Sequence, residues 1–437
     1  MTRAFRLTLI CLFVLLMFAA SVSPSQTRAS PTRGRARTPP TPTATRLVPT
    51  PTPAELHPAV YAPQQYRAAY GIQPLLDQGH DGTGQTIVLI ESYGAPNIQG
   101  IVDTYDQQYG LPPVSVRVLA PLGTVPFDPN NDEMVRWADE TVLDVEMAHV
   151  VAPGAGIVVL TSPVDETEGT AGLPEFLQLE QYAVAQHLGN IISQSWGASE
   201  YTLTDAAGRQ EIAIWDSFYK TATTQDHITF FASTGDNGAT DFTDASTTQL
   251  VNKPTIGFPA DDPWVTACGG TSLLTNGSQY GQVAWSGSNG GFSAFYSEPA
   301  YQQTLPTGYQ AQFDGKRGVP DVSSDSDPFT GLLLNSPFSD SPAGGTSAAA
   351  PFWAGLAAIA NQMAGHPLGF LNPALYKVEA SAAASSNFSD ITQGNNSVHD
   401  KGSNVRGYSA VPGWDAVTGL GAPNAVQLLP DLVRAAA

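Results

Sequence analysis

The chain has 437 residues, of which 42% are hydrophobic and 13% are charged, and its formal net charge at pH 7 is −20. Residues 57–437 hold 12 of the basic and 38 of the acidic residues, a formal net charge of −26. So acidic a surface argues against nucleic acid or an anionic membrane as a partner, and it also suits an acidic medium, in which many carboxylates are protonated.

The first 56 residues are predicted to lie outside the fold. Arg3 and Arg6 precede an apolar run at 7–20, which is typical of a secretory signal and short for a membrane span. We therefore expect residues 1–25 to be a signal peptide and the mature protein to be secreted, without a stable membrane anchor. Residues 38–53 contain six prolines and six threonines, so residues 26–56 are predicted to be an extended, disordered linker.

Residues 57–437 are long enough for one large domain, in which alternating strands and helices are predicted. The predicted strands are 85–91, 157–160, 190–195 and 228–233, and the predicted helices are 140–151, 175–187 and 206–222. Continuous apolar strands between helices indicate an α/β fold with a mostly parallel central sheet flanked by helices. Residues 240–345 are rich in Gly, Ser, Asn, Pro and aromatics, and we expect loops and short strands there.

In such sheets, functional residues lie at the carboxyl ends of the strands. Three of these ends are suggestive because polar or glycine-rich residues follow the apolar run: Glu91-Ser92-Tyr93-Gly94, Ser195-Trp196-Gly197 and Ser233-Thr234-Gly235-Asp236-Asn237-Gly238. An aspartate at Asp236 either forms a turn between glycines or points its carboxyl into a cleft. A protonated aspartate there could donate a hydrogen bond to a developing oxyanion.

Ser347 follows a glycine pair and precedes an apolar run of small residues at 348–360. This pattern predicts a loop that leads into a buried helix, with Ser347 near free backbone N–H groups and the positive end of the helix dipole. Such a position suits a nucleophile, and it equally suits a helix-capping serine. This segment alone leaves both interpretations open.

A nucleophilic serine needs a base, and none of the seven histidines lies in a glycine-flanked motif typical of a catalytic histidine. A helix predicted to begin near Asp139 and to end before Pro153 places Glu140 and Asp144 on one face, at positions i and i+4. Two carboxyls in contact share a proton, so such a pair can act as a base that also has a proton to donate. Acidic residues in the first turn of a helix are also common for structural reasons alone.

Together these segments resemble the sedolisins, the serine-carboxyl peptidases, and especially their kumamolisin-like members. Residues 344–351 look like the family's motif around the nucleophilic serine, and 140–144 look like its helix that carries a Glu and an Asp. Residues 233–238 look like its motif around the aspartate that binds the oxyanion. Further matches are 152–155, 193–197, 258–260, 269–272 and 317–322. The matches follow the family's order over about residues 57–435. The resemblance implies a subtilisin-like fold and a secreted, acid-active endopeptidase that acts on proteins or peptides, and we expect a monomer.

The resemblance also implies roles for individual residues. Ser347 attacks the peptide carbonyl and forms an acyl-enzyme. Glu140 takes the serine proton and returns it to the leaving amine, and Asp144 orients Glu140. Protonated Asp236 binds the oxyanion together with the Ser347 backbone N–H. A carboxylate base implies activity in acid, because a histidine would be protonated well below pH 6.

Two further residues match the family near the predicted catalytic residues, and the N-terminal region differs from the family's pattern. Glu91 and Trp196 match positions that extend the carboxyl network in kumamolisin-like members, although a strand-end carboxylate and a core aromatic are the structural alternatives. Sedolisins usually carry a long prodomain, whereas here about 35 residues separate the predicted signal from the peptidase domain. Secretion as a directly mature enzyme is therefore one hypothesis.

A calcium site is implied near the C-terminus. Two carboxylates and backbone carbonyls suit a hard cation, but spacing alone favours a solvated Asn/Asp/Gly loop. The resemblance implies one structural Ca²⁺, with the ligands Asp390, Ile391, Val411, Gly413 and Asp415.

Two other functions stay open. The chain could be a catalytically silent sedolisin-like binding module, or a tripeptidyl-peptidase. A histidine-dependent subtilisin-like hydrolase is disfavoured, since Glu91-Ser92 stands where that class would offer an aspartate.

Overall fold

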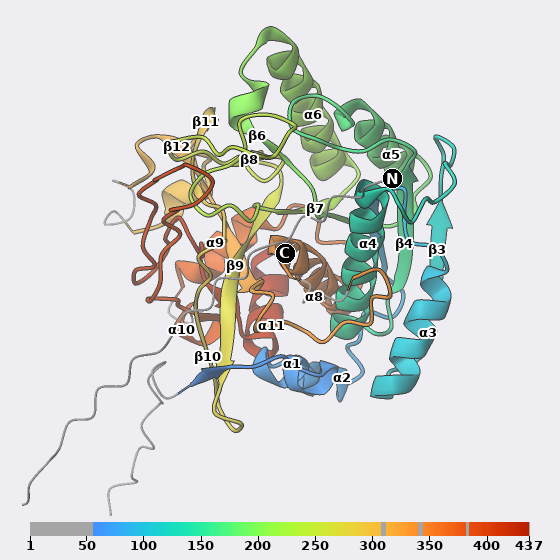
Figure 1. Ribbon diagram of the computed structural model, residues 1–437. Coiled ribbons are helices and arrows are strands. Elements are labelled where there is room, and N and C mark those ends of the chain that lie inside the picture. The colour runs from blue at the N-terminus through green and yellow to red at the C-terminus, as the bar shows by residue number, and fades with distance from the viewer. Residues whose placement is uncertain (1–55, 307–311, 340–343, 382–383, 437) are drawn as a thin grey trace, which may run out of the picture. The chain divides into compact units, whose positions relative to one another are not determined.

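The structure, a computed structural model, describes residues 56–306, 312–339, 344–381 and 384–436 (Figure 1). The chain divides into residues 1–50 and Pro51–Ala437, and every described residue belongs to the second unit. The predicted signal peptide, and the predicted linker except residue 56, lie outside the described residues. No helix within the described ranges is long and apolar enough to cross a membrane.

A mixed, mostly parallel sheet forms the centre of this unit. The strand order is β1-β9-β7-β5-β2-β4-β3, with β10 and β13 also paired to β9. All pairs are parallel except those of β1 and β10 with β9. The strands are β1 His57–Pro58, β2 Thr86–Ser92, β3 Val116–Leu119, β4 Gly156–Ser162, β5 Ile191–Gln194, β7 Thr229–Ser233, β9 Thr266–Thr275, β10 Tyr280–Ala284 and β13 Val322–Asp325.

Helices cover both faces of the sheet, as the continuous apolar strands predict. On β2, Ile87 and Leu89 face one hydrophobic core, whereas Val88 and Ile90 face another. The first core contains α1 Pro63–Ala69, α3 Ile98–Tyr109, α4 Asp132–Val151, α8 Ala349–Ala364, α9 Asn372–Glu379 and α11 Ala425–Ala436. The second contains α5 Leu173–Ala185 and α6 Ala206–Gln225, which lie at the top of the view in Figure 1.

Short elements connect these layers. They are α2 Gln73–Leu76, β6 Ala198–Ser199, η2 Glu200–Leu203, β8 Gly257–Phe258, β11 Gly291–Ser297, η3 Gln302–Thr304, β12 Lys316–Val319, η4 Thr346–Ala348, α10 Ala384–Asn387, β14 Phe388–Ser389 and β15 Ala422–Pro423. The predicted fold class is confirmed: the four predicted strands are β2, β4, β5 and β7, and the predicted helices correspond to α4, α5 and α6.

Two predictions about elements are wrong in detail. Helix α4 begins at Asp132 rather than near Asp139, because Asn131 Oδ1 accepts hydrogen bonds from the backbone N–H groups of Glu133 (2.9 Å) and Met134 (3.3 Å). The region 240–345 also contains β9, a ten-residue strand of the central sheet that pairs with β1, β7, β10 and β13.

The glycine pair Gly269-Gly270 obscured β9 in the sequence, since glycines usually mark turns. In the fold they permit close packing instead. A Cβ on Gly269 would lie 2.6 Å from Pro320 Cγ, and one on Gly270 would lie 2.8 Å from a ring carbon of Trp285.

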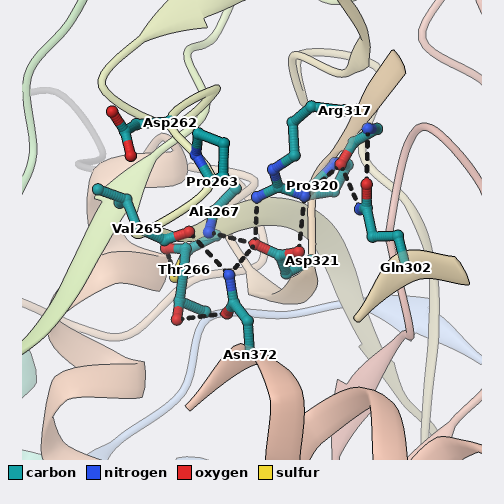
Figure 2. A network of polar contacts seen from close by, with 12 residues as sticks. Asp262, Pro263, Val265, Thr266, Ala267, Gln302, Arg317, Pro320, Asp321 and Asn372 are labelled. Carbon is teal, nitrogen blue, oxygen red and sulfur yellow. Dashed lines mark hydrogen bonds and ion pairs between the residues drawn. The ribbon is translucent and has the colours of Figure 1, made fainter. Parts of the chain in front are cut away.

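A buried ion pair ties β9 to the segment 317–321, one of the segments that match the family. Figure 2 shows the guanidinium of Arg317 facing the carboxyl of Asp321, at 2.8 Å (Nη1 to Oδ1) and 2.5 Å (Nη2 to Oδ2). Asp321 Oδ2 also accepts hydrogen bonds from Ala267 N at 2.8 Å and from Asn372 Nδ2 at 3.3 Å. Because both charges are paired and hydrogen-bonded, their burial is tolerated, and the pair joins β9, β12 and α9.

Candidate active site

Ser347 lies in the single turn η4, immediately before α8. Gly345 precedes this turn with φ +96°, a conformation that favours glycine. Gly345 N donates a hydrogen bond to Ser326 O at 2.7 Å, which fixes the turn against the segment after β13. Ser347 is half-buried and lines a cavity of about 200 Å³.

The carboxyl ends of three adjacent strands, β2, β5 and β7, lead toward this turn. Glu91 lies near the end of β2, Ser195 and Trp196 follow β5, and Asp236 follows β7. The three strand ends that the sequence singles out therefore belong to neighbouring strands.

Glu140 on α4 and Ser347 lie close enough for their side chains to interact. Burial, and next the negative charge of Asp144, raise the pKa of Glu140 well above its ordinary value, while the Ser347 side chain lowers it. The structure thus brings the predicted nucleophile and the predicted base into contact.

Asp144 lies behind Glu140, one helical turn away and fully buried. Ser195 Oγ lies 2.9 Å from Asp144 Oδ1, 2.8 Å from Asp144 Oδ2 and 3.2 Å from the carbonyl oxygen of Ser347. Burial raises the pKa of Asp144 to about 8, against the lowering effect of hydrogen bonds from Ser195 and Glu91. This carboxyl therefore holds a proton well into the neutral range.

Glu91 continues the chain of carboxyls on the far side of Asp144. It is completely buried, and burial followed by the charges of Asp144 and Glu140 raises its pKa well above the ordinary value. The interaction between the two side chains raises the pKa of Glu91 and lowers that of Asp144, as expected for two carboxyls that share a proton.

Asp236 approaches the Ser347 turn from the other side. Its Oδ1 accepts hydrogen bonds from Thr346 N at 2.7 Å and Thr346 Oγ1 at 3.0 Å. Although the residue as a whole is exposed, its carboxyl is enclosed by this turn, and burial raises its pKa despite the two bonds from Thr346. Oδ1 is occupied as an acceptor, which leaves Oδ2 to carry a proton.

Trp196 is adjacent to the site, but the structure does not join it to the carboxyls. Its ring packs against Phe176 and Trp215, and its Nε1 has no hydrogen-bond partner among the described residues. Its predicted supporting role stays a prediction.

The sequence patterns assign no role to Ser195 or Thr346, although the first donates a hydrogen bond to Asp144 and the second donates two to Asp236. Ser195 lies at a strand end and Thr346 next to Ser347, and both belong to segments that carry the resemblance. Nothing in the sequence shows which carboxyl each hydroxyl contacts, because the partners are 51 and 110 residues away.

Three neighbouring cavities surround these residues. One of about 320 Å³ is lined by Glu140, Ser195 and Trp196, and one of about 430 Å³ by Glu140 and Asp236. The third, of about 200 Å³, contains Ser347 itself. Glu140 and Ser347 are thus accessible from a branched cleft.

The predicted calcium ligands lie close together in the C-terminal region. Asp390 Oδ2 accepts a hydrogen bond from Gly413 N at 3.0 Å, and Asp415 Oδ2 accepts one from Val411 N at 3.1 Å. Ile391 is buried beside Asp390. The described residues contain no group of three or more Asp, Glu, His or Cys arranged for a metal, so a cation here would depend on two carboxylates and on backbone carbonyls.

No protein-family model matches the chain. Its relatives among known proteins are peptidases. Kumamolisin from Bacillus sp. (strain MN-32) is 33% identical over 389 residues, which cover 86% of this chain and 64% of kumamolisin. Sedolisin from Pseudomonas sp. (strain 101) is 28% identical over 302 residues, 65% of this chain and 48% of sedolisin. Tripeptidyl-peptidase 1 from Homo sapiens is 33% identical over 227 residues, 47% of this chain and 38% of the relative.

The chain spans less than two thirds of the length of these relatives. Among solved structures, Pseudomonas sedolisin, a serine-carboxyl proteinase complexed with two molecules of pseudo-iodotyrostatin, matches with a TM-score of 0.70 and 25% identity. The match covers 86% of this chain and 98% of that one, and it confirms the predicted subtilisin-like α/β fold.

Proposed function

Since the chain belongs to the sedolisin family of serine-carboxyl peptidases, we propose that it hydrolyses peptide bonds in proteins with Ser347 as the nucleophile. The observation that carries this proposal is that the Ser347 side chain lies close enough to Glu140 to lower the pKa of that carboxyl, whose pKa the charge of Asp144 in turn raises. The described cavity linings around Ser347 contain no histidine, so a carboxylate is the base at hand.

The chemistry follows from these contacts. Ser347 Oγ attacks the substrate carbonyl carbon while its proton passes to the Glu140 carboxylate. The oxyanion that forms accepts hydrogen bonds from Ser347 N–H and from the protonated carboxyl of Asp236. Glu140 then gives its proton to the amine, the C–N bond breaks, and the acyl-enzyme remains. Water then attacks the acyl-enzyme carbonyl carbon while Glu140 again takes the proton. The ester bond to Ser347 Oγ breaks, Oγ regains a proton, and the product carboxylic acid is released.

The reaction needs opposite protonation states at two carboxyls: Glu140 ionised as the base and Asp236 protonated. Because the pKa of Glu140 is raised, its protonation limits the rate in strong acid. Asp236 can donate to an oxyanion only while it is protonated, and its pKa is raised by burial. As the pH rises through that pKa, Asp236 becomes an anion that repels the oxyanion. We expect activity in acid and its loss toward neutrality.

The test is digestion of casein or haemoglobin between about pH 2 and pH 8. We expect cleavage that peaks in acid, and we expect Ser347→Ala and Glu140→Gln each to lower kcat by about a thousandfold or more, as for other catalytic groups. Far-UV circular dichroism serves as the control for folding. Activity that peaks near neutrality, or an unaltered rate in Glu140→Gln, would overturn the carboxylate mechanism, and absence of any cleavage would favour a silent binding module.

We propose endopeptidase rather than tripeptidyl-peptidase activity. The cavities on several sides of Ser347 and Glu140 support an extended cleft that binds substrate on both flanks of the scissile bond. Mass spectrometry of early products separates the two activities, because an endopeptidase gives internal fragments of varied length and the alternative gives tripeptides from the N-terminus.

The remaining proposals concern secretion, domain organisation and oligomeric state. We propose residues 1–25 as a secretory signal, 26–56 as a linker and 57–437 as the peptidase domain of a monomer. N-terminal sequencing of the secreted protein and light scattering test them.

We also propose that Asp390 and Asp415, with the carbonyls of Ile391, Val411 and Gly413, hold one structural Ca²⁺. Hard oxygen donors of this kind suit calcium, and the ion would neutralise the two carboxylates and cross-link their loops. Chelation should lower the melting temperature of the wild type but not that of Asp390→Asn. An unchanged wild-type value would contradict the site.

A further inference from the structure

A second group of carboxyls lies in the cleft, away from the reacting pair. Glu168 and Asp241 line the cavity of about 200 Å³ that also contains Ser347 and Asp236. Glu140 does not line this cavity. Because Glu140 serves the leaving amine in the proposed reaction, this cavity lies on the acyl side, where the residue that supplies the attacked carbonyl places its side chain.

Each of these two carboxyls is held by one oxygen and leaves the other free. Glu168 Oε2 accepts hydrogen bonds from Ser199 N at 2.8 Å and Thr202 Oγ1 at 3.0 Å. Asp241 Oδ1 accepts them from Phe242 N at 2.9 Å and Asn237 Nδ2 at 3.2 Å. Glu168 Oε1 and Asp241 Oδ2 accept no hydrogen bond from the described residues. Each side chain is thus fixed in position while one oxygen stays available to a ligand.

A third carboxyl, that of Glu166, lies at the adjoining cavity of about 320 Å³, which Glu168 also lines. Glu166 is only 9% exposed, and its Oε1 has no hydrogen-bond partner among the described residues. A buried polar atom that the protein leaves unpaired is costly. Glu166 thus adds a third buried carboxyl beside the pair.

The positive charges near this group do not neutralise it. Arg136 lines the adjoining cavity but is paired with Glu133 at 2.8 Å, and both side chains are largely exposed. Lys401 lies 4.4 Å from the centre of the Phe242 ring, outside both cavity linings, and its charge acts only on Asp241. The other charged groups that act on the pair, Asp236 and Asp244, are also acidic, and so is Asp165, which acts on Glu166.

Aromatic walls complete the cavity. Phe242, Phe258 and Trp196 line it alongside the carboxyls. Aromatic faces attract cations and also pack the aliphatic stems of lysine and arginine. The volume corresponds to roughly six waters at about 30 Å³ each, which is room for one long side chain.

We propose that Glu168 and Asp241 make this cavity selective for a basic side chain, lysine or arginine, on the substrate residue whose carbonyl Ser347 attacks. This inference rests on the proposed peptidase function and adds a substrate class to it. The guanidinium or ammonium group donates hydrogen bonds to the free oxygens of the pair, and its stem lies against the aromatic wall.

The selectivity depends on pH. Burial, followed by the charge of Asp241, raises the pKa of Glu168 to about 8, and burial raises that of Asp241 to about 6. In strong acid the pair is neutral, and a basic side chain must displace protons to bind. The preference for a basic residue therefore rises with pH.

Internally quenched peptides that differ only in arginine or citrulline before the scissile bond test the proposal, because citrulline has nearly the same shape without the charge. We expect the ratio of kcat/KM for arginine over citrulline to rise from near one at about pH 3 to about tenfold at about pH 6. Glu168→Gln and Asp241→Asn should each lower this ratio several-fold. Asp77→Asn, at an exposed position immediately after α2 and outside these cavities, is the matched control.

Two results would overturn the proposal: equal kcat/KM for the two peptides at every pH, or a preference that both cavity variants retain. Melting temperatures of the variants separate a binding defect from misfolding. Binding of the same peptides to Ser347→Ala, followed by fluorescence, needs no turnover. A preference for arginine there supports the inference even if no peptide is cleaved, and absence of cleavage by the wild type counts against the proposed function alone.

Discussion

Asp236 can lie against the Ser347 turn because residue 345 has no side chain. A Cβ on Gly345 would lie 2.3 Å from Asp236 Oδ2, and the φ of +96° is itself unfavourable for any other residue. The same carboxyl accepts two hydrogen bonds from Thr346 through Oδ1. Gly345 therefore sets the position of a group that is not its neighbour in sequence.

Gly345→Ala should displace Asp236 and lower kcat/KM by about a hundredfold, the usual effect of losing one oxyanion donor. Gly365→Ala is the matched control, because Gly365 also has a positive φ of +74° but has no atom within 4 Å of the added Cβ. It should lose about 1 kcal/mol of stability and keep its activity. Equal activity in the two variants, at matched folded fractions, would contradict the role given to Gly345.

Helix α4 presents Glu140 to the cleft and holds Asp144 buried behind it, and it is longer than its apolar pattern indicates. Its opposite side is also polar: Glu146 accepts a hydrogen bond from Asn335 N at 2.9 Å, and His149 Nε2 lies 2.9 Å from Asp106 Oδ1. The apolar pattern begins only near residue 138, because the first turns are partly exposed. The start of the helix is therefore set by its cap, Asn131.

Asn131→Ala removes the acceptor for two free N–H groups and should lower the free energy of unfolding by about 1 kcal/mol. Asn130→Ala, at the exposed position before the cap, should cost clearly less. Urea denaturation of both variants is the measurement. A smaller loss in Asn131→Ala than in Asn130→Ala would show that the cap does not determine where α4 begins.

The whole molecule keeps many carboxyls out of water. Burial raises the pKa of Glu146 to about 8 and those of Asp165 and Asp262 to about 7. A carboxyl with a higher pKa in the folded than in the unfolded chain stabilises the fold fully below its unfolded pKa, and this contribution is lost as the pH rises through the folded pKa. His149, whose pKa burial lowers to about 4, acts in the opposite direction below about pH 6.5.

We therefore expect the free energy of unfolding to fall between about pH 4 and pH 8. Glu180 on α5 isolates the effect, because it is fully buried, neither carboxyl oxygen has a partner among the described residues, and burial alone raises its pKa. Glu180→Gln should flatten the dependence of the free energy of unfolding on pH. The change over this pH range should shrink by about 1.4 kcal/mol for each pKa unit by which the fold raises the pKa of Glu180. Glu175→Gln, on the same helix but partly exposed, should not. Parallel curves for Glu180→Gln and the wild type would contradict this explanation.

The sequence by itself determined the alternating strands and helices, the polar strand ends and the spacing of Glu140 and Asp144, because these depend on periodicity and local chemistry. The tertiary structure alone decided which distant groups meet: Ser195 with Asp144, Thr346 with Asp236, and Glu168 with Asp241 in one cavity. It also decided that Gly269 and Gly270 belong to a buried strand, since only packing against Pro320 and Trp285 distinguishes them from a turn. Contacts between residues far apart in the chain depend on the order of strands in the sheet, which local sequence patterns do not encode.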